Sequence, residues 1–229
     1  MGLGLAYAGS QREDLLSLLL PPVADDSTSM EIASLAALAL GFVFVGSGNG
    51  EIASTILQTL MERDDKALDE KWGRFMAVGL GLLYLGLLIV GSCSNLMADA
   101  STGLQDSDTN DATIETLKAI EHPISKTAQV LVEVCSFAGS GNVLKVQTML
   151  HHCDDHIDMS KDKEKASEDA PDTKLDDTYQ AFAVIGIALV AMGEDIGAEM
   201  SLRQFNHLVH SYKSSSFPQL IHAAVDALW

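Results

Sequence analysis

The sequence of 229 residues has few aromatic residues, few cysteines and few basic residues, and each shortage excludes a class of protein. Aromatic residues make up 6% of the chain, so its core must use small and aliphatic side chains, which suit closely packed helices. Three cysteines, an odd number without framework spacing, form no disulfide scaffold and favour a reducing, intracellular compartment. The net charge of −18, from 14 basic and 32 acidic residues, repels nucleic acid and anionic membranes, so neither is expected as a partner.

Catalytic and nucleotide-binding motifs are also missing. The glycine-rich segments at 46–50 and 139–142 resemble phosphate-binding loops, but neither ends in the Lys-Ser/Thr pair of such a loop, and neither follows a predicted strand. No serine stands in the G-x-S-x-G pattern of a hydrolase nucleophile. We therefore expect that the chain is not an enzyme and that it has no catalytic residue and no cofactor.

One segment, 151–156 with the sequence HHCDDH, contains residues of the kind that bind metals. His152 and His156 stand four residues apart, as on one helix face, and Cys153 could join them across the turn. Because the sequence offers no second cluster of ligands, the end of a helix is the better interpretation, and we expect no metal. A packing role is expected for Cys153 or His151, and for Cys135.

A repeated pattern is the main positive feature of the chain. Five segments read as a helix of small residues that ends in a glycine turn, and the closing glycines are Gly9, Gly46, Gly86, Gly139 and Gly193. Successive glycines are 37, 40, 53 and 54 residues apart. The first two spacings are typical of two-helix solenoid repeats, and the longer ones leave room for loop insertions, which we place at 87–110 and 154–178. The second insertion is highly charged and lacks aromatic residues, so we expect it to be disordered.

Each repeat unit has the same internal plan. A helix rich in Gly and Ala can approach its neighbours closely, and the glycine that ends it accepts the left-handed conformation of a helix C-cap. An amphipathic helix follows, and serines at positions 10, 47 and 140 beside the glycine are expected to cap it or to form the turn. The apolar stripe of this helix comprises Ile52, Ile56, Leu57 and Leu60 in one unit, and Val143, Val146, Met149 and Leu150 in another. No segment alternates as a strand does, so the predicted fold class is all-α, an α-solenoid arc of two-helix repeats.

A multi-pass membrane protein is the alternative that the sequence leaves open. Residues 75–98 carry no charge and are long enough to cross a bilayer, and 178–193 form a second, shorter uncharged run. The first run, however, contains four glycines and several small polar residues, and its only basic flank is Lys71 and Arg74.

The repeat units resemble a known family. The segments that carry the resemblance are GLGLAYAGSQREDLLSLLLP, GSGNGEIASTILQTLMER, GLGLLYLG, FAGSGNVLKVQTMLHHC and IGIALVAMGEDIGAEMSLRQFNHLV. They are similar to the proteasome/cyclosome repeats of the two large non-ATPase scaffold subunits of the 26S proteasome regulatory particle, above all to the smaller one, the ubiquitin-receptor scaffold of its base. The resemblance implies that residues 1–210 form an arc of an α-α toroid, whereas the tail at 211–229 departs from the family pattern.

The same resemblance implies a function and a set of partners. It implies a non-catalytic scaffold that binds ubiquitin or ubiquitin-like domains and supports ubiquitin-dependent protein degradation, in the cytoplasm and the nucleus. The implied partners are ubiquitin, the ubiquitin-like domains of shuttle factors, the subunits of the proteasomal ATPase ring and a deubiquitinase.

The resemblance also implies a ubiquitin-binding site on the helix that follows the glycines at 46–50. Its acidic positions fall here on Glu51, Gln58 and Glu62, although Gln58 departs from the acidic residue of some family members. Together with Thr55 these residues stand at i, i+4, i+7 and i+11, which is one continuous stripe of a helix. The plainer interpretation of the same pattern is the solvated polar stripe that any surface helix has.

Overall fold

The computed structural model of the protein describes residues 1–86, 102–163, 178–192, 195–211, 221–222 and 224–225. All regular secondary structure in these ranges is α-helical, so the prediction of an all-α fold is confirmed. The chain divides into two compact units, Met1–Phe137 (unit 1) and Ala138–Trp229 (unit 2).

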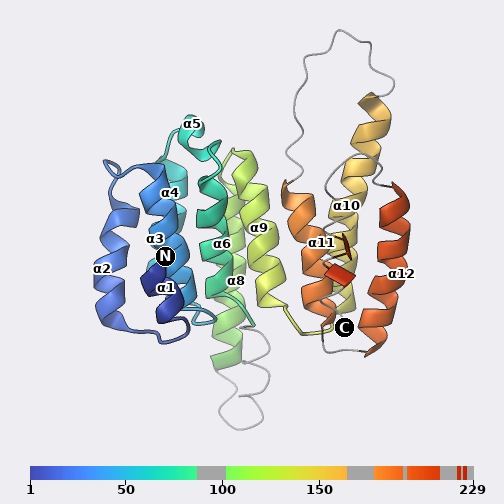
Figure 1. The fold of residues 1–229 in the computed structure, drawn as a ribbon, viewed down its shortest axis with the longest axis horizontal. Coiled ribbons are helices and arrows are strands. Elements are labelled where there is room, and N and C mark those ends of the chain that lie inside the picture. Colours follow the sequence, from blue (N-terminus) through green and yellow to red (C-terminus); the bar gives the residue numbers. More distant parts are fainter. Residues whose placement is uncertain (87–101, 164–177, 193–194, 212–220, 223, 226–229) are drawn as a thin grey trace. The chain divides into compact units, whose positions relative to one another are not determined.

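Unit 1 consists of two rows of helices (Figure 1). The first row contains α1 (Gly2–Ala6), α3 (Met30–Val43), α6 (Gly73–Leu83) and α9 (Pro123–Ser136), which pack side by side in this order. The second row contains α2 (Glu13–Ala24), α4 (Gly50–Glu62) and α8 (Thr102–Lys118), and the short α5 (Asp65–Leu68) lies between α4 and α6 in the chain. Because α1, α3 and α6 are each followed by a helix of the second row, unit 1 is built from the two-helix repeats that the sequence predicts.

Small residues let the first-row helices touch through their backbones. A methyl group built on Gly4 of α1 would lie 2.7 Å from the Cα atom of Ala39 on α3. One built on Gly79 of α6 would lie 2.7 Å from the carbonyl oxygen of Ala37, also on α3. Contacts this short leave no room for a side chain, so the expected close packing of the Gly- and Ala-rich helices is confirmed.

The predicted glycine turns are present, but their place relative to the helix ends differs from the prediction. Gly9, Gly46, Gly86 and Gly139 all have a positive φ, between 67° and 72°, and Gly193 lies outside the described residues. The residues that cap the C-termini of the preceding helices are instead Tyr7, Phe44, Tyr84 and Phe137. Each glycine therefore stands two residues beyond the C-cap, and ending its own helix is not its main role.

The corner glycines of unit 1 connect each repeat to the next one. The backbone N–H of the glycine donates a hydrogen bond to a carbonyl oxygen at the end of the next first-row helix: Gly9 to Phe42 at 2.9 Å, Gly46 to Leu82 at 3.0 Å, and Gly86 to Cys135 at 2.8 Å. The residue two positions later does the same: Gln11 to Val43 at 3.0 Å and Gly48 to Leu83 at 2.9 Å. These carbonyl groups lie in the last turn of their helix, where the regular helical donors end, so the corner supplies them with a donor from the neighbouring repeat and sets the register between repeats.

Unit 2 repeats this arrangement with α10 (Val143–Lys163), α11 (Thr178–Ala191) and α12 (Asp195–Ser211). Here α11 packs against both α10 and α12. The N–H of Gly139 donates to the carbonyl oxygen of Leu189 at 2.7 Å, and that of Gly141 donates to Val190 at 2.8 Å. The corner before α10 thus contacts the C-terminal end of α11, as the corners of unit 1 contact the helices that follow them.

Parts of the two predicted loop insertions are helical. Residues 102–110 belong to α8 and residues 154–163 belong to α10, so the prediction of loops is wrong at these positions. Charge makes a segment soluble but does not break a helix, whereas Gly and Pro do, and neither residue occurs between positions 143 and 170. The remaining parts, 87–101 and 164–177, lie outside the described residues, as does most of the predicted tail.

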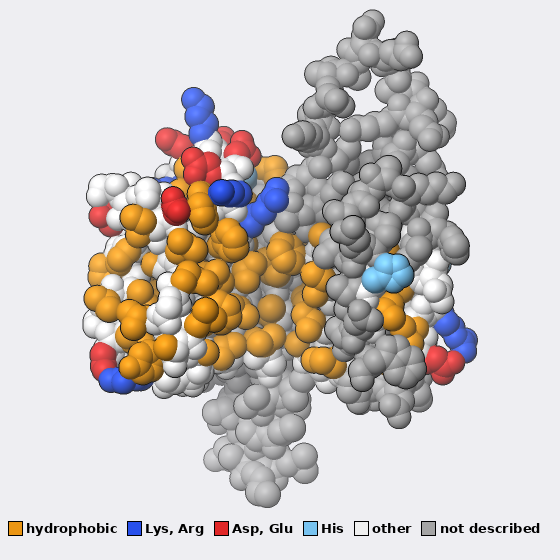
Figure 2. Space-filling view, in the orientation of Figure 1, with side chains coloured by type: hydrophobic (Ala, Val, Ile, Leu, Met, Phe, Trp, Pro, Cys, Tyr) orange, Lys and Arg blue, Asp and Glu red, His pale blue; other side chains and the backbone are white. Residues whose placement is uncertain are grey.

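The first row of unit 1 carries apolar side chains on its outward side. Ile32 on α3 and Phe75 on α6 are exposed, and Figure 2 shows hydrophobic side chains gathered over this part of the unit. Within the described ranges, however, no helix is both long and apolar enough to cross a bilayer. The uncharged run at 75–98 is interrupted, because α6 ends at Leu83, and α11 has only 14 residues.

Candidate functional site

The predicted site lies on α4, and α4 begins where it does because Asn49 caps it. The side-chain Oδ1 of Asn49 accepts hydrogen bonds from the N–H groups of Glu51 at 3.0 Å and Ile52 at 3.2 Å. Ser47 closes the turn before it: its hydroxyl donates to the carbonyl oxygen of Phe44 at 2.7 Å and accepts from the N–H of Asn49 at 3.3 Å. The cap satisfies two of the N–H groups that a helix start leaves free, and the predicted role of Ser47 as a turn former is confirmed.

One face of α4 is buried, as the sequence predicts. Ile52, Ile56 and Leu60 are at most 1% exposed, and Leu57 is buried beside them. Thr59 belongs to the same face, where its hydroxyl donates a 3.0 Å hydrogen bond to the carbonyl oxygen of Val23 on α2. Burial of four aliphatic side chains, each contributing about 1.5–3 kcal/mol, holds α4 against its neighbours in a fixed orientation.

The C-terminal end of α4 is attached to the connection between α2 and α3. The guanidinium group of Arg63 donates hydrogen bonds to the carbonyl oxygens of Asp26 at 3.1 Å, Thr28 at 2.9 Å and Asp25 at 2.9 Å. Three hydrogen bonds from one cation explain why this long side chain is mostly buried. With Asn49 at one end and Arg63 at the other, the outward face of α4 is held rigidly.

The three predicted site residues lie on that outward face. Glu51, Gln58 and Glu62 are all exposed, and the side-chain amide of Gln58 donates to Glu62 Oε1 at 2.8 Å. The Thr55 hydroxyl donates to the carbonyl oxygen of Glu51 at 2.8 Å, so it bonds within the helix. Met61, 56% exposed, adds an apolar side chain next to Glu62. The structure thus brings the predicted residues together as one acidic stripe with an apolar neighbour; we call it the α4 stripe.

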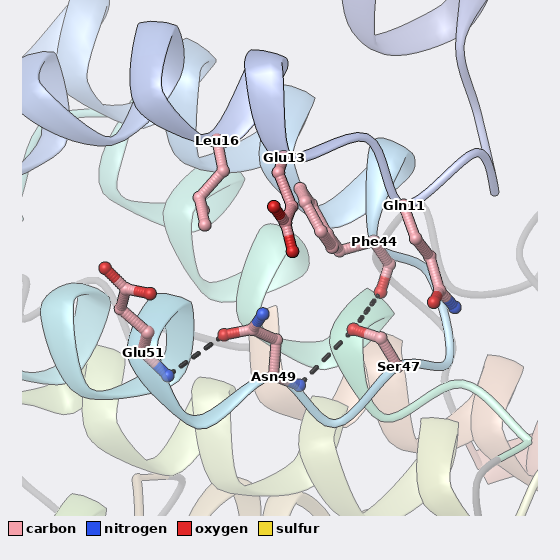
Figure 3. Close-up of a pocket in the computed structure, with 7 residues that line it drawn as sticks. All are labelled: Gln11, Glu13, Leu16, Phe44, Ser47, Asn49 and Glu51. Atoms are coloured by element: carbon pink, nitrogen blue, oxygen red, sulfur yellow. Dashed lines mark hydrogen bonds between the residues drawn. The ribbon is translucent and has the colours of Figure 1, made fainter.

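A hollow of about 540 Å³ opens between the N-terminal ends of α2 and α4 (Figure 3). It is lined by Gln11, Glu13, Leu16, Phe44, Ser47, Asn49 and Glu51. Sequence reasoning did not find it, although both corners are followed by acidic residues, at 13–14 and at 51. Glu51 therefore belongs both to the α4 stripe and to the wall of this hollow.

The second corner of the same kind, at 139–142, starts α10 in the same way without carrying the acidic stripe. Asn142 Oδ1 accepts from the N–H groups of Leu144 at 3.0 Å and Lys145 at 3.3 Å. Counted from the corner glycine, Leu144 takes the place that Glu51 has after Gly46, and it is 71% exposed. The corner is thus a structural element of the repeat, and the residue at this place differs between repeats: Glu51 on α4, Asp14 on α2 and Leu144 on α10.

The described side chains of the candidate metal-binding segment, those at 151–153, have different surroundings. Cys153 is buried, His151 is exposed, and the ring of His152 meets that of Tyr179 edge-on at 6.1 Å. Among the residues that the structure describes, no group of three or more His, Cys, Asp or Glu side chains could hold a metal ion, and the side chain of His156 lies outside them. Burial raises the pKa of the Cys135 thiol to about 12, which fits a packing role for this residue.

Comparison with known proteins shows that the chain is similar to members of one family. Residues 1–32 match the family model of the proteasome/cyclosome repeat. The chain is 47% identical, over 97% of its length, to the 26S proteasome regulatory subunit rpn1 of Schizosaccharomyces pombe. It is 45% identical over 92% of its length to the 26S proteasome regulatory subunit rpn-1 of Neurospora crassa. It is 42% identical over 91% of its length to the 26S proteasome non-ATPase regulatory subunit 2 of Dictyostelium discoideum.

The chain corresponds to only a part of these relatives. It spans 22%, 20% and 19% of their respective lengths, which is about a fifth. The names of these relatives describe regulatory subunits and, in one case, a non-ATPase subunit.

Proposed function

The chain belongs to the family of 26S proteasome regulatory subunits with proteasome/cyclosome repeats, and we propose that it is part of a non-catalytic scaffold whose α4 stripe binds ubiquitin or ubiquitin-like domains. The observation that carries this proposal is the separation of the two faces of α4. Its aliphatic side chains are buried, whereas Glu51, Gln58 and Glu62 are exposed on a helix that is fixed at both ends. A rigid acidic surface costs little ordering entropy when a partner binds to it.

The chemistry of the α4 stripe suits a ubiquitin fold. The recognised face of ubiquitin combines apolar residues with Lys, Arg and His, so carboxylates on the receptor steer and orient it. Glu51 and Glu62 supply that charge at the two ends of the stripe, and the exposed thioether of Met61 supplies an apolar contact. The strongly negative chain as a whole adds to the attraction of a basic face.

The expected affinity is low. An exposed ion pair contributes about 0.2–1 kcal/mol, and the stripe offers only two carboxylates. Binding to a single ubiquitin should therefore be weak and sensitive to salt, and ubiquitin chains should bind more tightly through avidity.

The proposal is tested by titrating the full chain into ¹⁵N-labelled ubiquitin and following the amide shifts by NMR. Wild-type protein should shift a contiguous set of ubiquitin signals, and the double variant Glu51→Lys, Glu62→Lys should abolish these shifts because it reverses both charges. The matched control is Glu31→Lys with Glu70→Lys, two exposed glutamates that do not belong to α4, and it should bind as the wild type does. Shifts that persist in the α4 variant would refute the assignment.

The other partners form part of the same proposal. A scaffold of this family would contact the subunits of the proteasomal ATPase ring and a deubiquitinase through other surfaces, and it would work in the cytoplasm and the nucleus. Fusion of an affinity tag to the intact scaffold that contains this chain should co-purify these partners from both compartments, whereas loss of the α4 carboxylates should reduce only the recovery of ubiquitin and ubiquitin-like domains.

A further inference from the structure

His122 joins the start of α9 to the connection between α5 and α6. Its Nδ1 accepts a hydrogen bond from the N–H of Ile124 at 3.1 Å, so this ring is the N-cap of α9. Its Nε2 lies 3.3 Å from Oδ1 of Asp69, the residue that follows α5. The His122 side chain is only 9% exposed, whereas that of Asp69 is 75% exposed. One buried ring thus holds together two connections of unit 1 that are far apart in the sequence.

The two contacts require one form of the ring. A neutral imidazole carries a proton on one nitrogen and a lone pair on the other. Because Nδ1 accepts from Ile124, the proton is on Nε2, which donates to the Asp69 carboxylate. In a protonated ring both nitrogens are donors, so Nδ1 would direct an N–H at the N–H of Ile124 and the cap would be lost.

The charges around His122 act on such a proton in opposite directions. Asp69 attracts a positive ring, whereas the N-terminus of α9 repels it, because the helix dipole is positive there. The other charged side chains at this end of α5, α6, α8 and α9 are all exposed, so solvent and salt screen them. They are Asp65, Lys66, Glu70, Lys71, Arg74, Lys118, Glu121 and Lys126.

The other side-chain caps described above are asparagines. Asn49 caps α4 and Asn142 caps α10, each through an amide oxygen that does not titrate. Histidine, in contrast, ordinarily gains a proton between about pH 5 and 8. We propose that His122 is a proton-sensitive joint, in which uptake of one proton from solvent at Nδ1 exchanges the cap of α9 for an ion pair with Asp69 and loosens the first turn of α9.

This change would reach the contact between two first-row helices. Ile124 is buried, and a methyl group built on Gly73, the first residue of α6, would lie 2.7 Å from its Cδ1 atom. A looser first turn of α9 therefore alters the packing of α9 on α6, and with it the coupling between neighbouring repeats. The inference concerns that coupling and does not depend on ubiquitin binding by the α4 stripe.

The test uses the ¹⁵N-labelled full chain and NMR at about pH 7.5 and about pH 5, near the two ends of the range in which histidine titrates. At the higher pH, Nδ1 of His122 should carry no proton and the amide of Ile124 should be protected from exchange. At the lower pH, both ring nitrogens should carry a proton. The protection of Ile124, corrected for the intrinsic exchange rate, should then fall about fivefold, the size expected for loss of an N-cap bond. Ile52, which Asn49 caps, is the internal reference, and its protection should stay the same.

The matched variant is His122→Asn, which keeps a capping oxygen and cannot take up a proton. In this variant Ile124 should be equally protected at both pH values. A fall in protection in the wild type alone supports the inference. A fall in both proteins, or in neither, overturns it, and so does a proton on Nδ1 of His122 at the higher pH. The ring signals come from the wild-type chain, so they decide the matter even if the variant does not fold.

Discussion

A methyl group built on Gly41 of α3 would lie 2.5 Å from the carbonyl oxygen of Gly79 on α6. The atom that it would meet belongs to the backbone, so no rotation of a side chain can relieve the contact. The two helices would have to move apart, and with them the α2 and α4 helices that pack on them.

Gly41→Ala should therefore lower the free energy of unfolding by about 1–3 kcal/mol, as overpacking of a tight core does. The control is Gly50→Ala, at the first position of α4, where a methyl group would meet no atom within 4 Å. That change should be neutral or stabilising by up to about 1 kcal/mol. Urea unfolding followed by circular dichroism measures both, and equal midpoints for the two variants would contradict the close contact.

Gln11 has a left-handed backbone conformation, and in two other repeats the residue at the same place is a glycine. Its φ is 51°, whereas Gly48 and Gly141, at the same place after their corner glycines, have φ of 59° and 62°. A left-handed conformation costs an ordinary residue about 1–2 kcal/mol, and glycine costs about 0.5–1 kcal/mol through the entropy of the unfolded chain.

Gln11→Gly should consequently stabilise unit 1 by up to about 1 kcal/mol, visible as a higher urea midpoint with an unchanged slope. Ser10→Gly, one residue earlier and outside the left-handed region, should bring no gain. Stabilisation by Ser10→Gly alone would show that the conformation of Gln11 is not the cause.

Asn49 caps the N-terminus of α4, the helix that carries the candidate site. Asn49→Ala removes the two hydrogen bonds to the N–H groups of Glu51 and Ile52 and should cost about 1 kcal/mol. The first turn of α4 should then fray, so hydrogen exchange of these two amides should accelerate more than that of Leu60. Asn142→Ala on α10 should give a similar loss of stability without any effect on α4.

Cys135 should be inert while the protein is folded. Because burial raises its pKa to about 12, only about one thiol in 10⁴ is ionised at pH 8, and the thiolate is the form that reacts. Alkylation by iodoacetamide, located by mass spectrometry, should be slow at Cys135 in buffer and fast in urea. Rapid modification of the folded chain would contradict the burial.

The same raised pKa has a consequence for stability. The unfolded thiol ionises near pH 9 and the folded one near pH 12, so the folded state binds more protons between these values. Stability that is fully present below about pH 9 is therefore lost as the pH rises toward 12. Cys135→Ala should lose less stability than the wild type over this range.

The sequence was most informative where one residue type decides the conformation. The recurrence of glycine predicted positive φ at Gly9, Gly46, Gly86 and Gly139, and the spacing of Ile52, Ile56 and Leu60 predicted the buried face of α4. Both follow from local rules, since left-handed backbone favours glycine and a helix repeats every 3.6 residues.

Features that depend on contacts between repeats could not be predicted in this way. The hydrogen bond from Gly46 to Leu82 requires knowledge of the register between two helices, and the hollow requires that α2 and α4 lie side by side. The extent of α10 to Lys163 was missed because a charged composition was interpreted as disorder. The binding role of Glu51, Gln58 and Glu62 stays a prediction until the titration is done.

The bonds from each corner to the following helix involve backbone groups only. The exposed side chains of a repeat can therefore change without altering these bonds. Repeats that are joined in this way can diverge in their exposed side chains while the connections between them are kept. Each repeat of such a protein can therefore present a different binding surface.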